Sequence, residues 1–173
     1  MLPDGIQPTQ RAAWLLRLGG WLRESGNPAD AAHANEEAAA LIRELAKESQ
    51  HSSYLADLAN ILRNLGVLYA DLGRHAEAVH LSEESVQILK GLAGTLPDRY
   101  SLAASLNNLA VQYLQVGRSG DAAQVAEEAI AIYREPADAL PDLYRPDLAR
   151  AIDNLSIIYW ELASIFRLPV VLA

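Results

Sequence analysis

The stretch NLGVLYADLGR, residues 64–74, decides the fold because it recurs along the chain. It returns as NLAVQYLQVGR at residues 108–118 and, in a weaker form, as NLSIIYWELA at residues 154–163, at spacings of 44 and 46 residues. Upstream, LGGWLRESGNPADAA at residues 18–32 matches LGVLYADLGRHAEAV at residues 65–79 at a spacing of 47 residues. Self-similarity at a fixed period is the signature of a repeat protein. The sequence therefore predicts three repeats and part of a fourth.

Each repeat opens with an apolar pattern that fits one face of a helix. In the second repeat the pattern advances in steps of 4, 3, 4 and 3 residues, at Leu58, Leu62, Leu65, Tyr69 and Leu72. Such steps place side chains on a single stripe of a helix. A glycine follows each of the first three such helices: Gly26, Gly73 and Gly117. Because glycine adopts the left-handed conformation that ends helices, it is expected to separate two antiparallel helices in each repeat.

The second helices and the joints between repeats have their own signals. Asn27–Pro28 offers an N-cap followed by a first-turn proline, and Ser119 is the expected cap of the third repeat's second helix. Four prolines are expected to break helices at the joints: Pro97, Pro136, Pro141 and Pro146. The predicted repeats cover residues 9–50, 51–96, 97–140 and 141–164, followed by an apolar tail at 165–173. The sequence thus predicts an all-α stack of helix pairs that forms a single domain over residues 1–173.

The repeated residues resemble the tetratricopeptide repeat. Leu62, Leu65–Gly66, Tyr69 and Ala78 fit its pattern in the second repeat. The period of 44 to 47 residues exceeds the usual 34 and is similar to the long repeats of kinesin light chains and of large bacterial signalling proteins. The resemblance implies a right-handed α-solenoid of three repeats and a half repeat, acting as a protein-binding module.

In such solenoids the first helices of the repeats line a concave groove. The resemblance implies that this groove holds a peptide or a partner helix, with asparagine amides bonding its main chain and arginine available for a carboxylate. The candidate groove residues are Arg63, Asn64, Val67, Asn107, Asn108, Val111, Leu114, Arg150, Asp153, Asn154 and Ile157. Two alternatives stay open, since the asparagines can instead brace neighbouring helices and the apolar residues can belong to the core between repeats.

The end of the chain is rich in apolar residues and poor in charge. The candidates for capping or self-association are Trp160, Ile165, Phe166, Val170, Val171 and Leu172. A repeat array needs polar ends, because a terminal unit otherwise exposes the face that a neighbour would cover. The tail is therefore expected to fold back as a cap, to mediate self-association, or to continue into a longer array.

Composition excludes several kinds of chemistry. The 173 residues contain no cysteine and carry a formal net charge of −8, which disfavours nucleic acid as a partner. The four histidines lack the spacing of metal ligands, and glutamate pairs recur once per repeat at Glu36–Glu37, Glu83–Glu84 and Glu127–Glu128, which is typical of a solvated face rather than of catalysis. We therefore expect no enzyme activity, no cofactor, no metal and no membrane partner, and a cytoplasmic location.

Two functions follow from these observations. The first is a non-catalytic module that binds a protein or peptide in the concave groove. The alternative is an oligomerisation or regulatory segment of a larger signalling protein, which associates with itself through its apolar C-terminal end.

Overall fold

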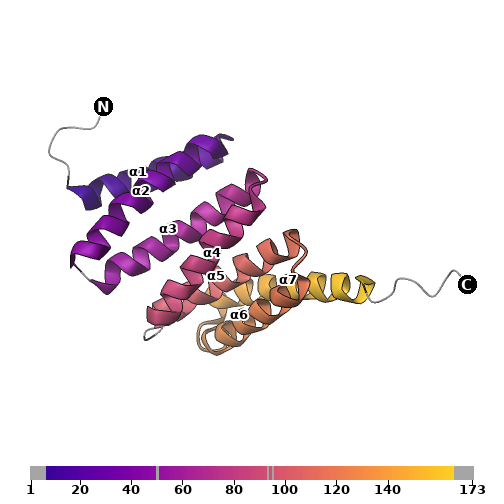
Figure 1. Ribbon diagram of the computed structural model, residues 1–173. Helices are drawn as coiled ribbons and strands as arrows, with labels where there is room; N and C mark the ends of the chain where they lie inside the picture. Colours follow the sequence, from indigo (N-terminus) through magenta and orange to yellow (C-terminus); the bar gives the residue numbers. More distant parts are fainter. Residues whose placement is uncertain (1–6, 50, 93, 95, 166–173) are drawn as a thin grey trace, which may run out of the picture. The chain divides into compact units, whose positions relative to one another are not determined.

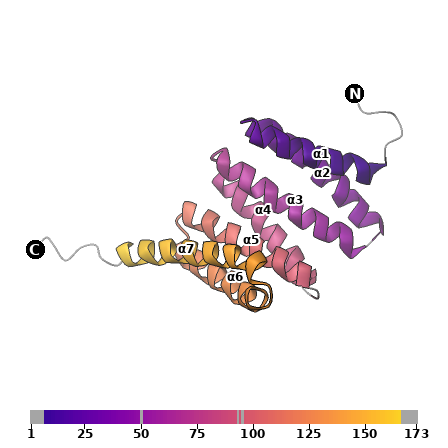
Figure 2. The ribbon, with the colours of Figure 1, turned by 180° about the vertical axis from the view of Figure 1, so that it is seen from behind.

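The computed structural model describes residues 7–49, 51–92, 94 and 96–165. Over these residues it contains seven helices and no strand, so the predicted all-α class is confirmed. The helices are α1 (Pro8–Glu24), α2 (Pro28–Ser49), α3 (Ser52–Asp71), α4 (His75–Leu92), α5 (Leu96–Gln115), α6 (Ser119–Ala139) and α7 (Pro141–Ile165), as Figures 1 and 2 show. In the described part of the chain, no helix combines the length and the apolar character needed to cross a membrane.

The chain divides into two compact units. The first ends at Asp98 and contains α1, α2, α3 and α4. The second begins at Arg99 and contains α6, α7 and nearly all of α5.

Three helix pairs turn at a glycine with a positive φ, and the predicted helix ends are confirmed. The φ angles are 81° at Gly26, 75° at Gly73 and 77° at Gly117. Between α3 and α4, the Gly73 amide donates to the Ala70 carbonyl at 3.0 Å and the Arg74 amide donates to the Tyr69 carbonyl at 2.8 Å. These bonds satisfy carbonyls that the end of a helix leaves unpaired, and an L side chain at Gly73 would strain the turn.

The core of the first unit joins its first three helices to the start of α4. The predicted stripe of α3 is buried at Leu58, Leu62, Leu65 and Tyr69. The second helices contribute small side chains, which let the helices approach closely. Ser85 of α4, for example, donates from its Oγ to the Ala59 carbonyl of α3 at 2.7 Å.

The core of the second unit contains an aromatic cluster. Tyr133 of α6 is fully buried, and its ring centroid lies 5.7 Å from that of Tyr100 on α5. The Tyr100 ring lies 5.1 Å from that of Tyr144 on α7, and the Tyr100 hydroxyl donates to the Asp147 carboxylate. Edge-on and tilted ring pairs at these distances are attractive, so the cluster holds all three helices of the unit together.

Two of the four proline predictions are wrong. Pro136 lies inside α6 and Pro146 lies inside α7, and both helices continue past them. Pro136 is buried, and near Pro146 the Tyr144 ring packs in the aromatic cluster and Asp147 accepts its Tyr100 hydroxyl. Tertiary packing therefore compensates for the backbone hydrogen bond that each proline cannot donate. Pro97 and Pro141 lie in the first turns of α5 and α7, where the missing N–H is not needed.

The predicted cap at Ser119 is also wrong. The Ala122 amide donates to the Arg118 carbonyl at 2.9 Å, so the helix bonding begins one residue earlier and Arg118 occupies the N-cap position. Ser119 is the first residue of α6 and is buried.

Candidate partner-binding groove

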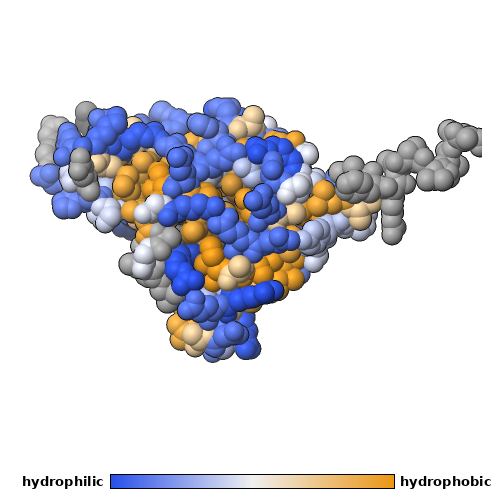
Figure 3. All heavy atoms as spheres, turned by 60° about the horizontal axis from the view of Figure 1, so that its bottom comes forward, coloured by the Kyte–Doolittle hydropathy of each residue, from blue (hydrophilic) through white to orange (hydrophobic). Residues whose placement is uncertain are grey.

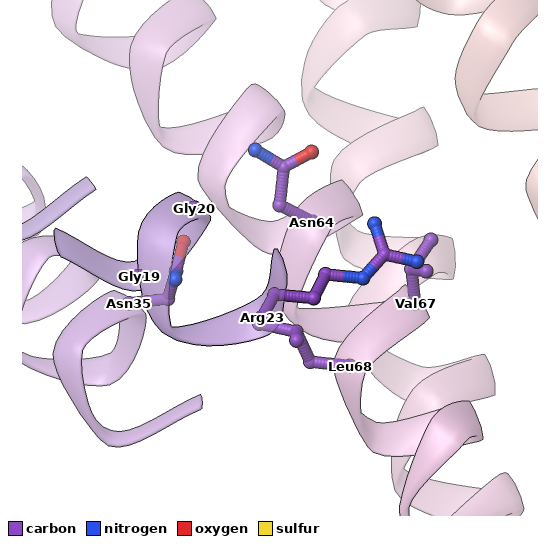
Figure 4. Close-up of a pocket in the computed structure, with 7 residues that line it drawn as sticks. All are labelled: Gly19, Gly20, Arg23, Asn35, Asn64, Val67 and Leu68. Carbon is purple, nitrogen blue, oxygen red and sulfur yellow. The ribbon is translucent and has the colours of Figure 1, made fainter. Parts of the chain in front are cut away.

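A hollow opens between α1 and α3 in the first unit. Its volume is about 160 Å³, and its lining residues are Gly19, Gly20, Arg23, Asn35, Asn64, Val67 and Leu68 (Figure 4). Two of the predicted groove residues, Asn64 and Val67, lie in this lining. Arg63, their neighbour on α3, is partly buried and is not part of it.

Consecutive glycines on α1 create the hollow. A Cβ atom at Gly20 would meet no atom within 4 Å, so the missing side chain leaves open space there. A Cβ atom at Gly19 would lie only 2.2 Å from Asn35 Nδ2. Asn35 is buried and donates from Nδ2 to the Ala31 carbonyl at 2.8 Å, so its amide forms a fixed wall. Gly19 thus permits close packing of α1 on α2, whereas Gly20 keeps the hollow open.

The hollow combines polar and apolar lining. Arg23 extends from α1 toward Val67 of α3 (Figure 4), and its guanidinium lies 3.3 Å from the Asp71 carboxylate. That ion pair is about half exposed and uses one of the guanidinium nitrogens, so further donors remain for a ligand. The exposed amide of Asn64 supplies both donors and an acceptor, while Val67 and Leu68 supply apolar contact.

In the second unit, two of the predicted asparagines bond each other. Asn154 of α7 donates from Nδ2 to Oδ1 of Asn107 on α5 at 3.1 Å. Asn107 is buried, at 2% exposure. The sequence left open whether the asparagines bind a ligand or brace neighbouring helices, and this pair braces two helices.

The other predicted groove residues of the second unit are spread along α5 and α7. Asn108 and Leu114 are half-buried, and Val111, Asp153 and Ile157 are exposed. Arg150 lies 2.6 Å from the Asp147 carboxylate, within the same helix.

A hydrogen bond from tyrosine to glutamate joins two helices in each unit and was not predicted. The Tyr69 hydroxyl of α3 donates to Glu36 of α2, and the Tyr159 hydroxyl of α7 donates to Glu127 of α6. Burial and the Glu36 carboxylate raise the pKa of Tyr69 above its ordinary value. The first glutamate of the repeated pairs thus binds the next repeat in these two places, although the pattern was interpreted as a solvated face. The signal was available in the sequence, since tyrosine follows glutamate by 33 and 32 residues.

A second and larger hollow, of about 600 Å³, lies on the second unit between α6 and α7. Its lining residues are Glu127, Ile130, Ala131, Arg134, Ile152, Leu155, Ser156 and Tyr159. Of the residues predicted for capping or self-association, Trp160 is exposed on α7. The side chain of Ile165 and all of Phe166, Val170, Val171 and Leu172 lie outside the described residues.

Neither hollow has the residues of a metal site. Within the described ranges, no three histidine, cysteine, aspartate or glutamate side chains lie close enough to hold a metal ion.

Comparison with known proteins agrees with this architecture. The sequence model of a family described as "Tetratricopeptide repeat" matches residues 57–135. Residues 57–135 belong to the tetratricopeptide repeat family. Tetratricopeptide repeats in general mediate protein–protein interactions. A search of curated proteins finds no match to the chain.

Solved structures share the fold over nearly the whole chain. The crystal structure of BtubC (BKLC) from P. vanneervenii has a TM-score of 0.74 and 21% identity, covering 93% of this chain and 60% of that one. Aspartyl phosphate phosphatase F from Bacillus subtilis has a TM-score of 0.71 and 15% identity, covering 94% of this chain and 38% of that one. At these identities the likeness shows the fold alone, and it confirms the predicted α-solenoid of helix pairs. The chain spans less than two thirds of the length of either protein.

Proposed function

We propose that the chain is a non-catalytic protein–protein interaction module that holds a peptide or a partner helix in the hollow between α1 and α3. The observation that carries this proposal is the open space at Gly20, where an asparagine amide, a guanidinium and an apolar wall meet. The cytoplasmic location expected from the sequence stays a prediction.

The lining suggests what the hollow binds. An apolar cavity of similar volume holds a benzene-sized group, so about 160 Å³ suits one apolar side chain of a ligand. Asn64 would bond the ligand's main chain, because an amide pairs with both N–H and C=O groups. Arg23 would attract a carboxylate at the rim. The expected ligand is therefore a segment with an acidic residue close to an apolar one.

A steric plug tests the proposal. Gly20→Leu fills the hollow without strain, since the position is helical and its Cβ direction is open. The matched control is Gly120→Leu, which changes an exposed glycine in the first turn of α6 with equally open space. Peptides selected from a random display library on the unmodified chain provide the ligands.

We expect Gly20→Leu to weaken binding of the selected peptides at least tenfold, and Asn64→Ala to weaken it as well. Gly120→Leu is expected to bind them like the unmodified chain. Equal affinity of the Gly20→Leu variant, with helicity unchanged in circular dichroism, would overturn the groove assignment.

The second candidate function is self-association as a regulatory segment of a larger protein. The observation that favours it is the cluster of exposed apolar side chains on α7, which includes Ile157 and Trp160. Exposed apolar patches of this kind mark interaction sites. Light scattering across a concentration series tests it, because a monomer at every concentration removes this candidate and leaves the groove proposal intact.

A further inference from the structure

The first helix that the structure describes, α1, exposes a stripe of large apolar side chains. Trp14, Leu18 and Trp21 are 57%, 37% and 62% exposed. Their spacing of four and three residues places them on one face of the helix. We call these three residues the head patch.

The same positions one repeat later show how unusual this exposure is. At the spacing of 47 residues, the head patch corresponds to Ile61, Leu65 and Leu68 of α3, which are 1%, 2% and 3% exposed. In α3 this face joins the core that α2 shares. Among the described residues no helix precedes α1, so the face that is covered in α3 lies open in α1.

The helix α7 is open on a different face. Ile152 and Tyr159 of α7 are each 47% exposed, whereas their equivalents Leu62 and Tyr69 in α3 are 1% and 9% exposed. In the first unit, α4 packs beside α3 in the same hairpin. On α7 the corresponding surface instead borders the hollow of about 600 Å³ against α6. We call this hollow the tail hollow. Figure 3 brings the lower edge of Figure 1 forward, and on this face orange apolar atoms reach the surface among blue polar ones.

Charge distinguishes between the possible arrangements of two copies. Three arginines and one glutamate give α1 a net charge of +2. Nine acidic and three basic residues give α6 and α7 together a net charge of −6. The acidic helix pair α6–α7 of one copy would repel the same pair of another copy, whereas it attracts the basic helix α1. Arg17 lies on α1 between Trp14 and Trp21 and makes no ion pair within the described residues. The lining of the tail hollow includes Glu127, which accepts the Tyr159 hydroxyl, and Arg134. The attraction therefore comes from the opposite charges of the two helical surfaces as a whole.

We propose that the chain binds a second copy of itself head to tail, with the head patch of one copy seated in the tail hollow of the next. The proposal does not rest on peptide binding in the hollow between α1 and α3. It assigns a specific pair of surfaces to self-association and differs from association through the apolar C-terminal end. Because the two surfaces are different, each bound copy leaves one of them free, and association continues beyond a dimer.

Complementary variants test this arrangement. The head variant is Trp14→Ala/Trp21→Ala, and the tail variant is Ile152→Arg, which places a positive charge opposite the basic helix. Trp14 and Trp21 are more than half exposed and Ile152 is 47% exposed, so circular dichroism is expected to show unchanged helicity. Arg17→Glu is a second head variant that removes no apolar contact.

Analytical ultracentrifugation at micromolar to near-millimolar concentrations measures the outcome. We expect the unmodified chain to associate progressively and each variant alone to associate at least tenfold more weakly. An equimolar mixture of the head and tail variants is expected to form a dimer and to stop there, since only one intact pair of surfaces remains. Added salt is expected to weaken association, because the attraction is between opposite charges.

Three results would overturn the proposal. The first is a monomeric unmodified chain at every concentration. The second is a head variant that associates as well as the unmodified chain, which would indicate symmetric contact through the tail. The third is association that appears only after residues 166–173 are removed, which would show that the chain covers its own hollow. None of these results bears on peptide binding by the groove, which the Gly20→Leu variant tests separately.

Discussion

The neighbouring glycines of α1 are expected to respond in opposite ways to the same substitution. Alanine stabilises the interior of a helix by about 1 kcal/mol relative to glycine. At Gly20 nothing opposes this gain, since a Cβ there meets no atom within 4 Å. Gly20→Ala is therefore expected to raise the free energy of unfolding by about 1 kcal/mol.

Gly19→Ala gains the same helix propensity but displaces Asn35. A Cβ at this position would lie 2.2 Å from Asn35 Nδ2 and 3.3 Å from the Ala31 carbonyl oxygen. The amide must rotate away and lose its 2.8 Å bond to that carbonyl, which leaves a buried polar group without a partner at a cost of about 1–3 kcal/mol. A strained rotamer adds about 1 kcal/mol. We expect Gly19→Ala to lower the free energy of unfolding by about 1–3 kcal/mol, once the propensity gain is deducted.

Urea unfolding followed by tryptophan fluorescence measures both changes. Two of the three tryptophans, Trp14 and Trp21, flank the glycines on α1, so a Trp160→Phe background makes the signal report this helix alone. Asn35→Ala provides the matched control, because removing the amide removes the close contact. Gly19→Ala is expected to be much less harmful in that background. Equal stabilisation by alanine at both glycines, or an effect of Gly19→Ala that Asn35→Ala leaves unchanged, would refute the reasoning.

Two further predictions concern buried hydroxyl groups and a titrating tyrosine. Ser82 Oγ is buried and has no hydrogen-bond partner within the described part of the chain, so Ser82→Ala is expected to raise the free energy of unfolding by about 1 kcal/mol in denaturant titrations. Ser85→Ala, three residues away, is expected to lower it by about 1 kcal/mol, because its hydroxyl bonds the Ala59 carbonyl; the same sign for both variants would contradict this account. Burial and the hydrogen bond to Glu36 raise the pKa of Tyr69 above its ordinary value of 10.0. The protonated hydroxyl therefore stabilises the folded chain fully below pH 10, and this contribution to the free energy of unfolding is lost as the pH rises through the folded-state pKa. Relative to Tyr69→Phe, the unmodified chain is thus expected to lose stability on titration above pH 10, and a constant difference between the two would argue against the assignment.

Several features of the candidate sites depend on packing that the sequence leaves undetermined. The predicted asparagines look alike along the chain, yet Asn64 is exposed beside the groove while Asn154 and Asn107 bond each other. Gly19 and Gly20 are adjacent and chemically identical, but only one of them faces a neighbouring side chain. In each case the deciding partner lies on another helix, where a small change in helix rotation replaces one neighbour with another.

The sequence by itself determined the helix pairs and their order. A stripe at helical spacing and a glycine at each turn act through local backbone geometry, which needs no distant partner, so the helix ends at Gly73 and Gly117 follow directly from the residues there. Tertiary structure decided the rest. Pro136 and Pro146 stay helical because packing offsets a local penalty, and the head patch and the tail hollow lie open because burial at a repeat position depends on whether a neighbouring helix is present. A repeated pattern specifies which face of each helix is apolar, and only the assembled helices show which of those faces are buried.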